Sequence, residues 1–375
     1  MMPGNKNLNA ARIAKNDEFY TLYTDVEREM LAYLRYSPEV FRGKTILLPC
    51  DNPVQSNFTK YFARNFERLG LRKLISTSYA GSMRSGQISL FDETTIDMPK
   101  RLYEPHGRIA VLDHAICGDD IPWDYLEGNG DFRSKEITAL RDEADMILTN
   151  VPFSLLQPFL FWVVESRKQF AFIGNMNSIT CNDTFPLLKS GQIWLGITQP
   201  KVFITPDGNR ESFGNTCWIT NIDHGLRHEP LPLVSMQENI AHNECLRRIL
   251  LERYKQNPNV LHYEKYRNYD GIEVPILEAL PSDYTGVAGV PISVLNHFCA
   301  EQLELVGCSV NADAKALGMR EIGEEWIKAY REHGGTGNYT AHMHNLVLLT
   351  DGGVPIAPFK RILVRLKAPG ASGAF

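Results

Sequence analysis

The chain has 375 residues, of which 43% are hydrophobic and 22% are charged. This length and composition allow a large buried core in one large or two medium domains and exclude a disordered or fibrous protein. No stretch reaches the roughly 18 consecutive apolar residues of a membrane span, and the polar start has no apolar signal-peptide core. We therefore expect a cytoplasmic protein. The net charge of −5 does not by itself point to a polyanionic partner.

Metal binding is not expected. The seven cysteines are scattered, and none forms a C-x-x-C pair with zinc spacing. His342 and His344 alternate on an expected loop without a third ligand nearby, and two histidines alone do not make a metal site.

Positive charge gathers at the two ends of the chain. A basic tail over residues 1–16, expected to be flexible, carries three cations and no acid, and a second basic run lies near the C-terminus. The cations of these two segments are Lys6, Arg12, Lys15, Lys360, Arg361, Arg365 and Lys367. Such segments give weak support for a nucleic-acid partner, because short basic ends are often only solvated.

The first part of the chain alternates helix and strand patterns. Thr24 and Glu27 have the spacing of a capping box and predict a helix over 25–36. An apolar run predicts a strand over 44–49, and aromatic residues at helical spacing predict a helix over 56–69 that ends at Gly70. A second strand is expected over 72–78.

Further apolar runs at 108–113, 144–149 and 170–174 predict strands, with a helix over 155–166. Strands alternating with helices predict an α/β fold with a mostly parallel sheet covered on both faces. Residues 193–198 and 216–222 have no helix-length connection, so we expect an antiparallel pair at the sheet edge.

The pattern changes after residue 225. Residues 236–256 read as helical, whereas 257–375 are rich in Pro, Gly and Tyr and show no α/β alternation. We therefore divide the chain into a first domain over 17–225 and a smaller, irregular region over 226–375.

The tetrapeptide Asn150-Val151-Pro152-Phe153 follows one of these strands, at the end where open parallel sheets bind ligands. An exocyclic aryl amine is a poor nucleophile because its lone pair is delocalised into the ring. An Asn oxygen and a backbone carbonyl can accept both amine hydrogens, and Pro152 helps fix the carbonyl of Val151. Phe153 offers a face for stacking an unstacked base. The competing interpretation is an ordinary loop, since Asn and Pro are common there.

A methyl donor would leave a different signature from a nucleotide. No glycine-rich phosphate loop follows the first strand. S-adenosylmethionine has no phosphate, so acids and aromatic rings suit it, and Asp51 and the pair Asp131-Phe132 are candidates. Taken alone, residues of these types are more often surface acids or core aromatic residues.

In order along the chain, these segments resemble the EcoRI-type adenine-specific DNA methyltransferases. The resemblance runs through Asp17-Glu18-Phe19-Tyr20-Thr21, Cys50-Asp51-Asn52-Pro53, residues 130–136 (GDFRSKE) and residues 149–155 (TNVPFSL), and it reaches residues 361–364 (RILV). It covers nearly the whole chain.

The resemblance implies a Rossmann-like methyltransferase domain over 17–225, a target-recognition region over 226–375, and flipping of adenine out of duplex DNA. It places Asn150, Val151, Pro152 and Phe153 on the catalytic loop. The residues that it assigns to S-adenosylmethionine are Phe19, Tyr20, Thr21, Asp51, Asp131 and Phe132. It also points to a restriction endonuclease as cognate partner, and we expect the enzyme to act as a monomer.

Two departures qualify the resemblance. The family pattern is Asn-Pro-Pro-Phe, and here its first proline is Val151. No acid follows the strand over 72–78, where many methyltransferases hold the cofactor ribose. Alternatives are therefore a catalytically impaired DNA-binding relative, or a methyltransferase acting on RNA, cytosine N4 or a protein amide.

Overall fold

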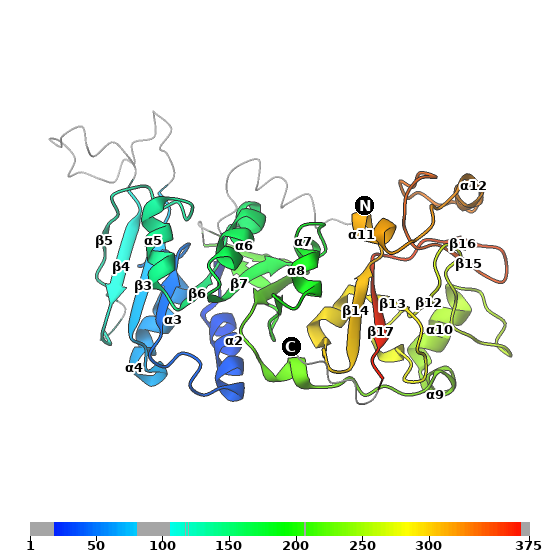
Figure 1. Ribbon diagram of the computed structural model, residues 1–375, viewed down its shortest axis with the longest axis horizontal. Helices are drawn as coiled ribbons and strands as arrows, with labels where there is room; N and C mark the ends of the chain where they lie inside the picture. Colours follow the sequence, from blue (N-terminus) through cyan, green and yellow to red (C-terminus); the bar gives the residue numbers. More distant parts are fainter. Residues whose placement is uncertain (1–18, 81–105, 117, 119, 206–207, 369–375) are drawn as a thin grey trace. The chain divides into compact units, whose positions relative to one another are not determined.

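The structure is a computed structural model that describes residues 19–80, 106–116, 118, 120–205 and 208–368 (Figure 1). The expected tail over 1–16 and the motif residues Asp17 and Glu18 lie outside the described residues. The chain forms two compact units, one of Met1–Ser178 with Trp194–His224 and one of Ile179–Ile193 with Gly225–Phe375. Residues 179–193, which the sequence places with the first domain, therefore belong to the second unit.

The first unit is built on an eight-stranded sheet. In spatial order its strands are β5 (Asp124–Tyr125), β4 (Arg108–Leu112), β3 (Lys73–Ser78), β2 (Thr45–Leu48), β6 (Met146–Thr149), β7 (Gln169–Asn175), β11 (Thr216–Thr220) and β8 (Trp194–Leu195). The α/β class is confirmed. The prediction of a mostly parallel sheet is wrong, because only β3, β2, β6 and β7 pair in parallel, while both edges are antiparallel.

The two edges differ in what the sequence reveals. The antiparallel pair expected from 193–198 and 216–222 is confirmed, with Ile219 opposite Leu195. At the other edge Arg108 lies opposite Ser78, so the chain re-enters the sheet at the end where β3 leaves it. A strand that begins there must run back antiparallel to its neighbour. The apolar run at 108–113 predicts a strand but carries no information on its direction.

Helices flank this sheet (Figure 1). They are α2 (Tyr23–Tyr36), α3 (Asn57–Arg64), α4 (Phe66–Leu69), α5 (Lys135–Glu143) and α6 (Leu156–Glu165), with the short α7 (Met176–Ile179) after β7. The helix predicted over 56–69 is divided at Asn65, which caps α3, and it ends at Gly70 as expected, with φ +62°. The capping box at Thr24 is wrong, because α2 begins at Tyr23 and its N-cap, Leu22, makes no side-chain cap.

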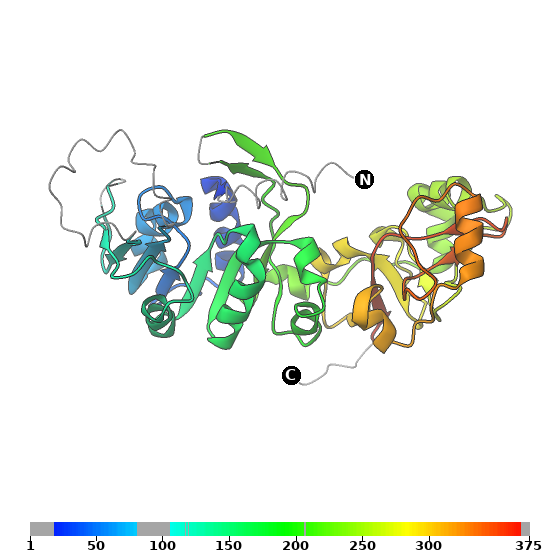
Figure 2. The same ribbon diagram turned by 90° about the horizontal axis from the view of Figure 1, so that it is seen from above.

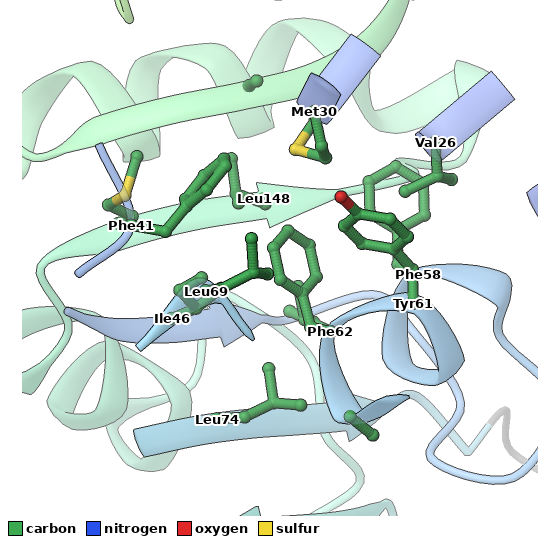
Figure 3. Packing of buried hydrophobic residues seen from close by; sticks show 14 of the residues in the cluster. Val26, Met30, Phe41, Ile46, Phe58, Tyr61, Phe62, Leu69, Leu74 and Leu148 are labelled. Atoms are coloured by element: carbon green, nitrogen blue, oxygen red, sulfur yellow. The ribbon is translucent and has the colours of Figure 1, made fainter. Parts of the chain in front are cut away.

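Successive residues of the central strands pack on opposite faces of the sheet. Ile46 and Leu148 pack in one core cluster with Met30 of α2 and Phe62 of α3, as Figure 3 shows. On the other face the ring of Phe172 lies 5.2 Å from that of Phe159 in α6. Because helices cover both faces of the sheet, every residue of β2 and β6 is buried. This explains why these strands appear in the sequence as continuous apolar runs.

A second, three-stranded antiparallel sheet in this unit was not predicted. It joins β1 (Tyr20–Thr21), β9 (Val202–Ile204) and β10 (Arg210–Ser212). In Figure 2, β9 and β10, drawn in green, project away from the main sheet. Strands of two or three residues are too short for a detectable hydrophobic period, so the sequence does not predict them.

The second unit contains more regular structure than expected. A four-stranded sheet has the order β12 (Ile272–Glu273), β13 (Ala288–Pro291), β17 (Arg361–Leu366), β14 (Leu303–Cys308), and β15 (Leu348–Leu349) pairs with β16 (Pro355–Ile356). Its helices are α8 (Phe185–Lys189), α9 (Met236–His242), α10 (Glu244–Glu252), α11 (Asn311–Ala316) and α12 (Glu324–Glu332). The description of this region as irregular is therefore wrong. Pairing between strands far apart in the sequence leaves no local signal.

The C-terminal basic run does not form a free cationic surface. Arg361 is buried and pairs with Glu273, whose carboxylate also accepts hydrogen bonds from the hydroxyl groups of Tyr254 and Tyr266. Arg365 pairs with Glu304 at 2.9 Å, and Lys360 Nζ donates to Thr180 Oγ1 at 2.7 Å. These cations are used within the unit, so the run no longer supports a nucleic-acid partner. Within the described ranges, no helix is long and apolar enough to cross a membrane.

Candidate active site

A cavity of about 390 Å³ lies at the carboxyl ends of β2 and β6 in the first unit. It brings together every residue that the sequence singles out: Phe19, Tyr20, Thr21, Asp51, Asp131, Phe132, Asn150, Val151, Pro152 and Phe153. They come from four segments that span more than 130 positions of the chain. The cavity size is that of a pocket for a drug-sized ligand, which ranges from about 300 to 1,000 Å³.

Asn150 is held by two hydrogen bonds to other segments. Its side-chain Nδ2 donates to the backbone carbonyl of Phe19, and its backbone N–H lies 3.4 Å from Asp51 Oδ2. None of the described residues donates a hydrogen bond to Asn150 Oδ1. The side-chain atom that remains for a ligand is therefore an acceptor.

Asp51 is buried at the end of β2 and links this strand to β6 and α3. Its carboxylate accepts from the hydroxyl groups of Ser56 and Thr149, each at 2.6 Å. Ser56 is also the N-cap of α3, because its Oγ accepts from the Phe58 N–H at 3.0 Å. Burial raises the pKa of Asp51 to about 6, against the opposing effect of these hydrogen bonds.

The three residues after Asn150 differ in exposure. The Val151 side chain is only 2% exposed, and its N–H makes no hydrogen bond to the described residues. Pro152 has φ −53° and ψ 131° and precedes a single 3₁₀ turn, η2 (Phe153–Leu155). Phe153 is half-buried: its ring packs on the core cluster, yet the residue also lines the cavity.

Asp131 and Phe132 form another wall. The Asp131 carboxylate accepts from Arg133 Nε at 2.9 Å and from Arg133 Nη2 at 2.6 Å, and this contact lowers its pKa. Phe132 is buried, with its ring in edge contact with Phe159 and Trp162. Both residues line the cavity. The Asp131 carboxylate is already paired with Arg133, and the Phe132 ring already packs against Phe159 and Trp162.

The segment Phe19-Tyr20-Thr21 also lines the cavity. Its residues Tyr20 and Thr21 form β1, and Asn57 Nδ2 donates to the Thr21 carbonyl at 2.8 Å. The hydroxyl of Tyr20 donates to Gln55 at 3.2 Å. The buried Thr21 hydroxyl has no hydrogen-bond partner among the described residues.

The cavity also contains residues to which the sequence assigned no role. Arg133 contributes a cation, and Tyr79 contributes a half-exposed ring directly after β3. Gly130 is required by close packing, because at φ +77° a Cβ would lie 2.2 Å from the Ser78 carbonyl oxygen. Tyr79 follows a predicted strand directly, and such positions face the ligand, so the sequence marks it as a position to inspect. Within the described ranges, no His, Cys, Asp and Glu side chains are grouped as metal ligands.

The site presents a fixed amide oxygen, aromatic rings and two carboxylates, with no phosphate-binding glycine loop. This combination fits a methyltransferase site for an amine, since each amine hydrogen requires an acceptor. Residues 7–367 match the family model described as "Adenine-specific methyltransferase EcoRI". The chain belongs to this family.

Individual relatives agree with the family assignment. Type II methyltransferase M.EcoRI of Escherichia coli is 37% identical over 84% of this chain and 93% of that protein. Type II methyltransferase M.MpnI of Mycoplasma pneumoniae is 30% identical over 81% of this chain and 86% of that protein. No solved structure is significantly similar to the chain.

Proposed function

We propose that this protein transfers a methyl group from S-adenosylmethionine to the N6 amine of an adenine flipped out of duplex DNA. One observation carries the proposal most directly. Asn150 donates its own amide hydrogen to the Phe19 carbonyl and so offers Oδ1 as an acceptor at the cavity. An acceptor is the group that an amine nucleophile requires.

The chemistry follows from this placement. Asn150 Oδ1 and the Val151 carbonyl accept the two N6 hydrogens, which reduces delocalisation of the nitrogen lone pair into the purine ring. S-adenosylmethionine, held by the cofactor residues, would supply the methyl group to this nitrogen, and its sulfur would keep the electron pair of the carbon–sulfur bond. The methylated nitrogen finally loses one proton to solvent. Preorganised polar groups of this kind contribute most when they act only in the transition state.

The residues present fit the cofactor. S-adenosylmethionine, when bound, supplies an electrophilic methyl group on a sulfonium and offers no phosphate to a glycine loop. The carboxylates of Asp51 and Asp131 match its positive groups, and Phe132 and Phe19 offer apolar surface for its adenine and methionine parts. We assign Phe19, Tyr20, Thr21, Asp51, Asp131 and Phe132 to its binding.

The two regions of the chain take different roles in this proposal. Every described residue that lines the cavity belongs to the first unit, which supports a Rossmann-like methyltransferase domain over 17–225. Its four central parallel strands support the same assignment. Residues 226–375 would then recognise the DNA target. The type II names of the relatives favour a role in a restriction-modification system. We propose in addition that the enzyme is cytoplasmic, acts as a monomer and has a cognate endonuclease.

The test is to incubate the protein with unmethylated genomic DNA and S-adenosylmethionine and to map modified bases by sequencing. We expect N6-methyladenine within one short recurring sequence, and none with the Asn150→Ala variant. Methylation at cytosine N4, or transfer only to RNA or protein, would contradict the proposed target. Cofactor binding without any transfer would indicate a catalytically impaired relative.

A further inference from the structure

The small sheet of β1, β9 and β10 lies next to the catalytic loop, and its contacts with that loop are specific. Phe19, directly before β1, provides the carbonyl that receives the Asn150 amide hydrogen. This bond fixes which end of the Asn150 amide is nitrogen and which is oxygen. An amide turned by half a rotation would present donors to the substrate amine, and donors cannot accept its hydrogens.

The Phe19 carbonyl is itself held on two sides. In β1, Tyr20 pairs with Ile204 and Thr21 pairs with Phe203, both in β9. On the other side Asn57, the first residue of α3, binds the Thr21 carbonyl. The segment that carries this acceptor is therefore anchored both to the small sheet and to α3.

The same small sheet also supports Phe153. The Phe153 ring lies 5.9 Å from Phe19, 6.0 Å from Phe203 and 5.6 Å from Phe213, measured between ring centroids. Phe203 and Phe213 contact each other at 5.5 Å, and neither is among the described residues that line the cavity. Both are buried, with Phe203 fully so. They can therefore affect a bound base through Phe153, whose ring both of them contact.

We propose that Phe203 and Phe213 are positioning residues for methyl transfer, which hold the Phe153 ring in the orientation that receives the base. This inference rests on the proposed function. The β9–β10 segment is thus part of the active-site machinery although it contributes no described residue to the cavity. Each aromatic contact is weak, but three of them converge on one ring whose orientation decides stacking.

The experiment compares Phe203→Leu and Phe213→Leu with two matched controls in the same core. Phe62→Leu and Phe66→Leu change buried phenylalanines that do not line the cavity, where Phe62 matches Phe203 and Phe66 matches Phe213 in burial. Single-turnover methyl transfer to duplex DNA, the dissociation constant of the cofactor and the melting temperature are measured for each. We expect the Phe203 and Phe213 variants to transfer about 3- to 10-fold more slowly than controls of equal melting temperature. Cofactor affinity should stay unchanged.

A double-mutant cycle separates positioning from general destabilisation. If Phe203 and Phe213 act through Phe153, their substitutions should have no further effect on transfer in a Phe153→Ala background. Additive effects in that background, or rates equal to those of the controls, would overturn the proposal. If Phe203→Leu does not fold, Phe213→Leu at its slightly exposed position decides the question. A wild-type protein without any transfer activity would instead reject the proposed function.

Discussion

Two segments that line the cavity each carry an acid, Asp51 on one and Asp131 on the other. The two carboxylates differ in burial and in the charge of their partners. At the ends of β2 and β6, burial raises the pKa of Asp51 to about 6, although its hydrogen bonds from neutral donors act to lower it. On the segment after Gly130, Asp131 is partly exposed and paired with Arg133, so its pKa is lowered.

This difference indicates which of the two acids sets the position of the loop that carries Asn150. Asp51 connects Thr149, Asn150 and the N-terminus of α3, so a change in its charge alters the hydrogen bonds that place the catalytic loop. Asp131 acts on the orientation of Arg133 and of its own loop. We therefore expect changes near Asp51 to affect the transfer step as well as cofactor binding, and changes near Asp131 to affect cofactor binding alone.

The largest effect should come from Asn150→Ala. Removal of one preorganised polar group from an active site costs roughly 10²-fold or more in rate. We expect that loss in single-turnover transfer, with the melting temperature nearly unchanged because the side chain is not part of the core. A variant that retains more than half of the wild-type rate would remove Asn150 from the mechanism.

Phe153→Ala should weaken transfer by about 1–3 kcal/mol through lost stacking on the flipped base. The defect should be smaller on duplexes with a mismatch at the target adenine, because less unstacking work is needed there. Transfer rates on matched and mismatched duplexes provide the measurement. Equal defects on both would assign Phe153 to packing against Phe19, Phe203 and Phe213 alone.

The transfer rate should rise with pH through about 6. Below that pH Asp51 is protonated and loses acceptor capacity for Thr149 and the Asn150 N–H, whereas above it the carboxylate is ionised and accepts both. Single-turnover rates between pH 5 and pH 8 at saturating cofactor measure the profile, and Asp51→Asn should remove this step. A rate that is flat across the range, or that falls as pH rises, would contradict this role.

Stability should depend on the two acids with opposite sign. Because the pKa of Asp51 is raised, its stabilising contribution is present at acid pH and is lost as pH rises through about 6. The pKa of Asp131 is lowered, so its contribution is present at neutral pH and is lost in acid. Melting curves of Asp51→Asn and Asp131→Asn against pH test this, and slopes that deviate from wild type in the same direction would be inconsistent with it.

The smallest effect should come from Val151→Pro. The Val151 N–H makes no hydrogen bond to the described residues, and the residue that follows is already an extended proline. Proline at a compatible position changes stability by about 0.4–1 kcal/mol in the favourable direction. We expect an equal or faster transfer rate and a melting temperature that does not fall. A clear drop in both would show that valine marks a reshaped loop.

The sequence predicts the site better than the sheet that carries it. Strand ends followed by polar residues, such as Asp51 and Asn150, can be recognised because each strand is a local apolar run. The direction of β4 and the pairing of β1 with β9 depend on contacts between distant segments, which no local pattern records. The same holds for the sheet of the second unit.

The internal contacts of the site were also beyond prediction. Sequence alone identifies Phe19 and Phe153 as separate motif residues, but the contact between their rings and the role of Phe213 need the folded chain. The C-terminal cations show the reverse case, in which a visible charge pattern is neutralised by partners such as Glu273 and Glu304.

The most direct test compares Asn150→Ala with Asp131→Asn in two assays, the dissociation constant of S-adenosylmethionine and the single-turnover transfer rate at saturating cofactor. We expect the two variants to differ in opposite directions in cofactor affinity and transfer rate. Asn150→Ala should keep its cofactor affinity and lose the transfer step, whereas Asp131→Asn should bind cofactor about tenfold more weakly, a change of roughly 1.4 kcal/mol, and transfer at nearly the wild-type rate. The proposed division of roles is that Asn150 acts in transfer and Asp131 acts in cofactor binding. It is contradicted if both variants lose affinity and rate together, or if Asn150→Ala loses only affinity.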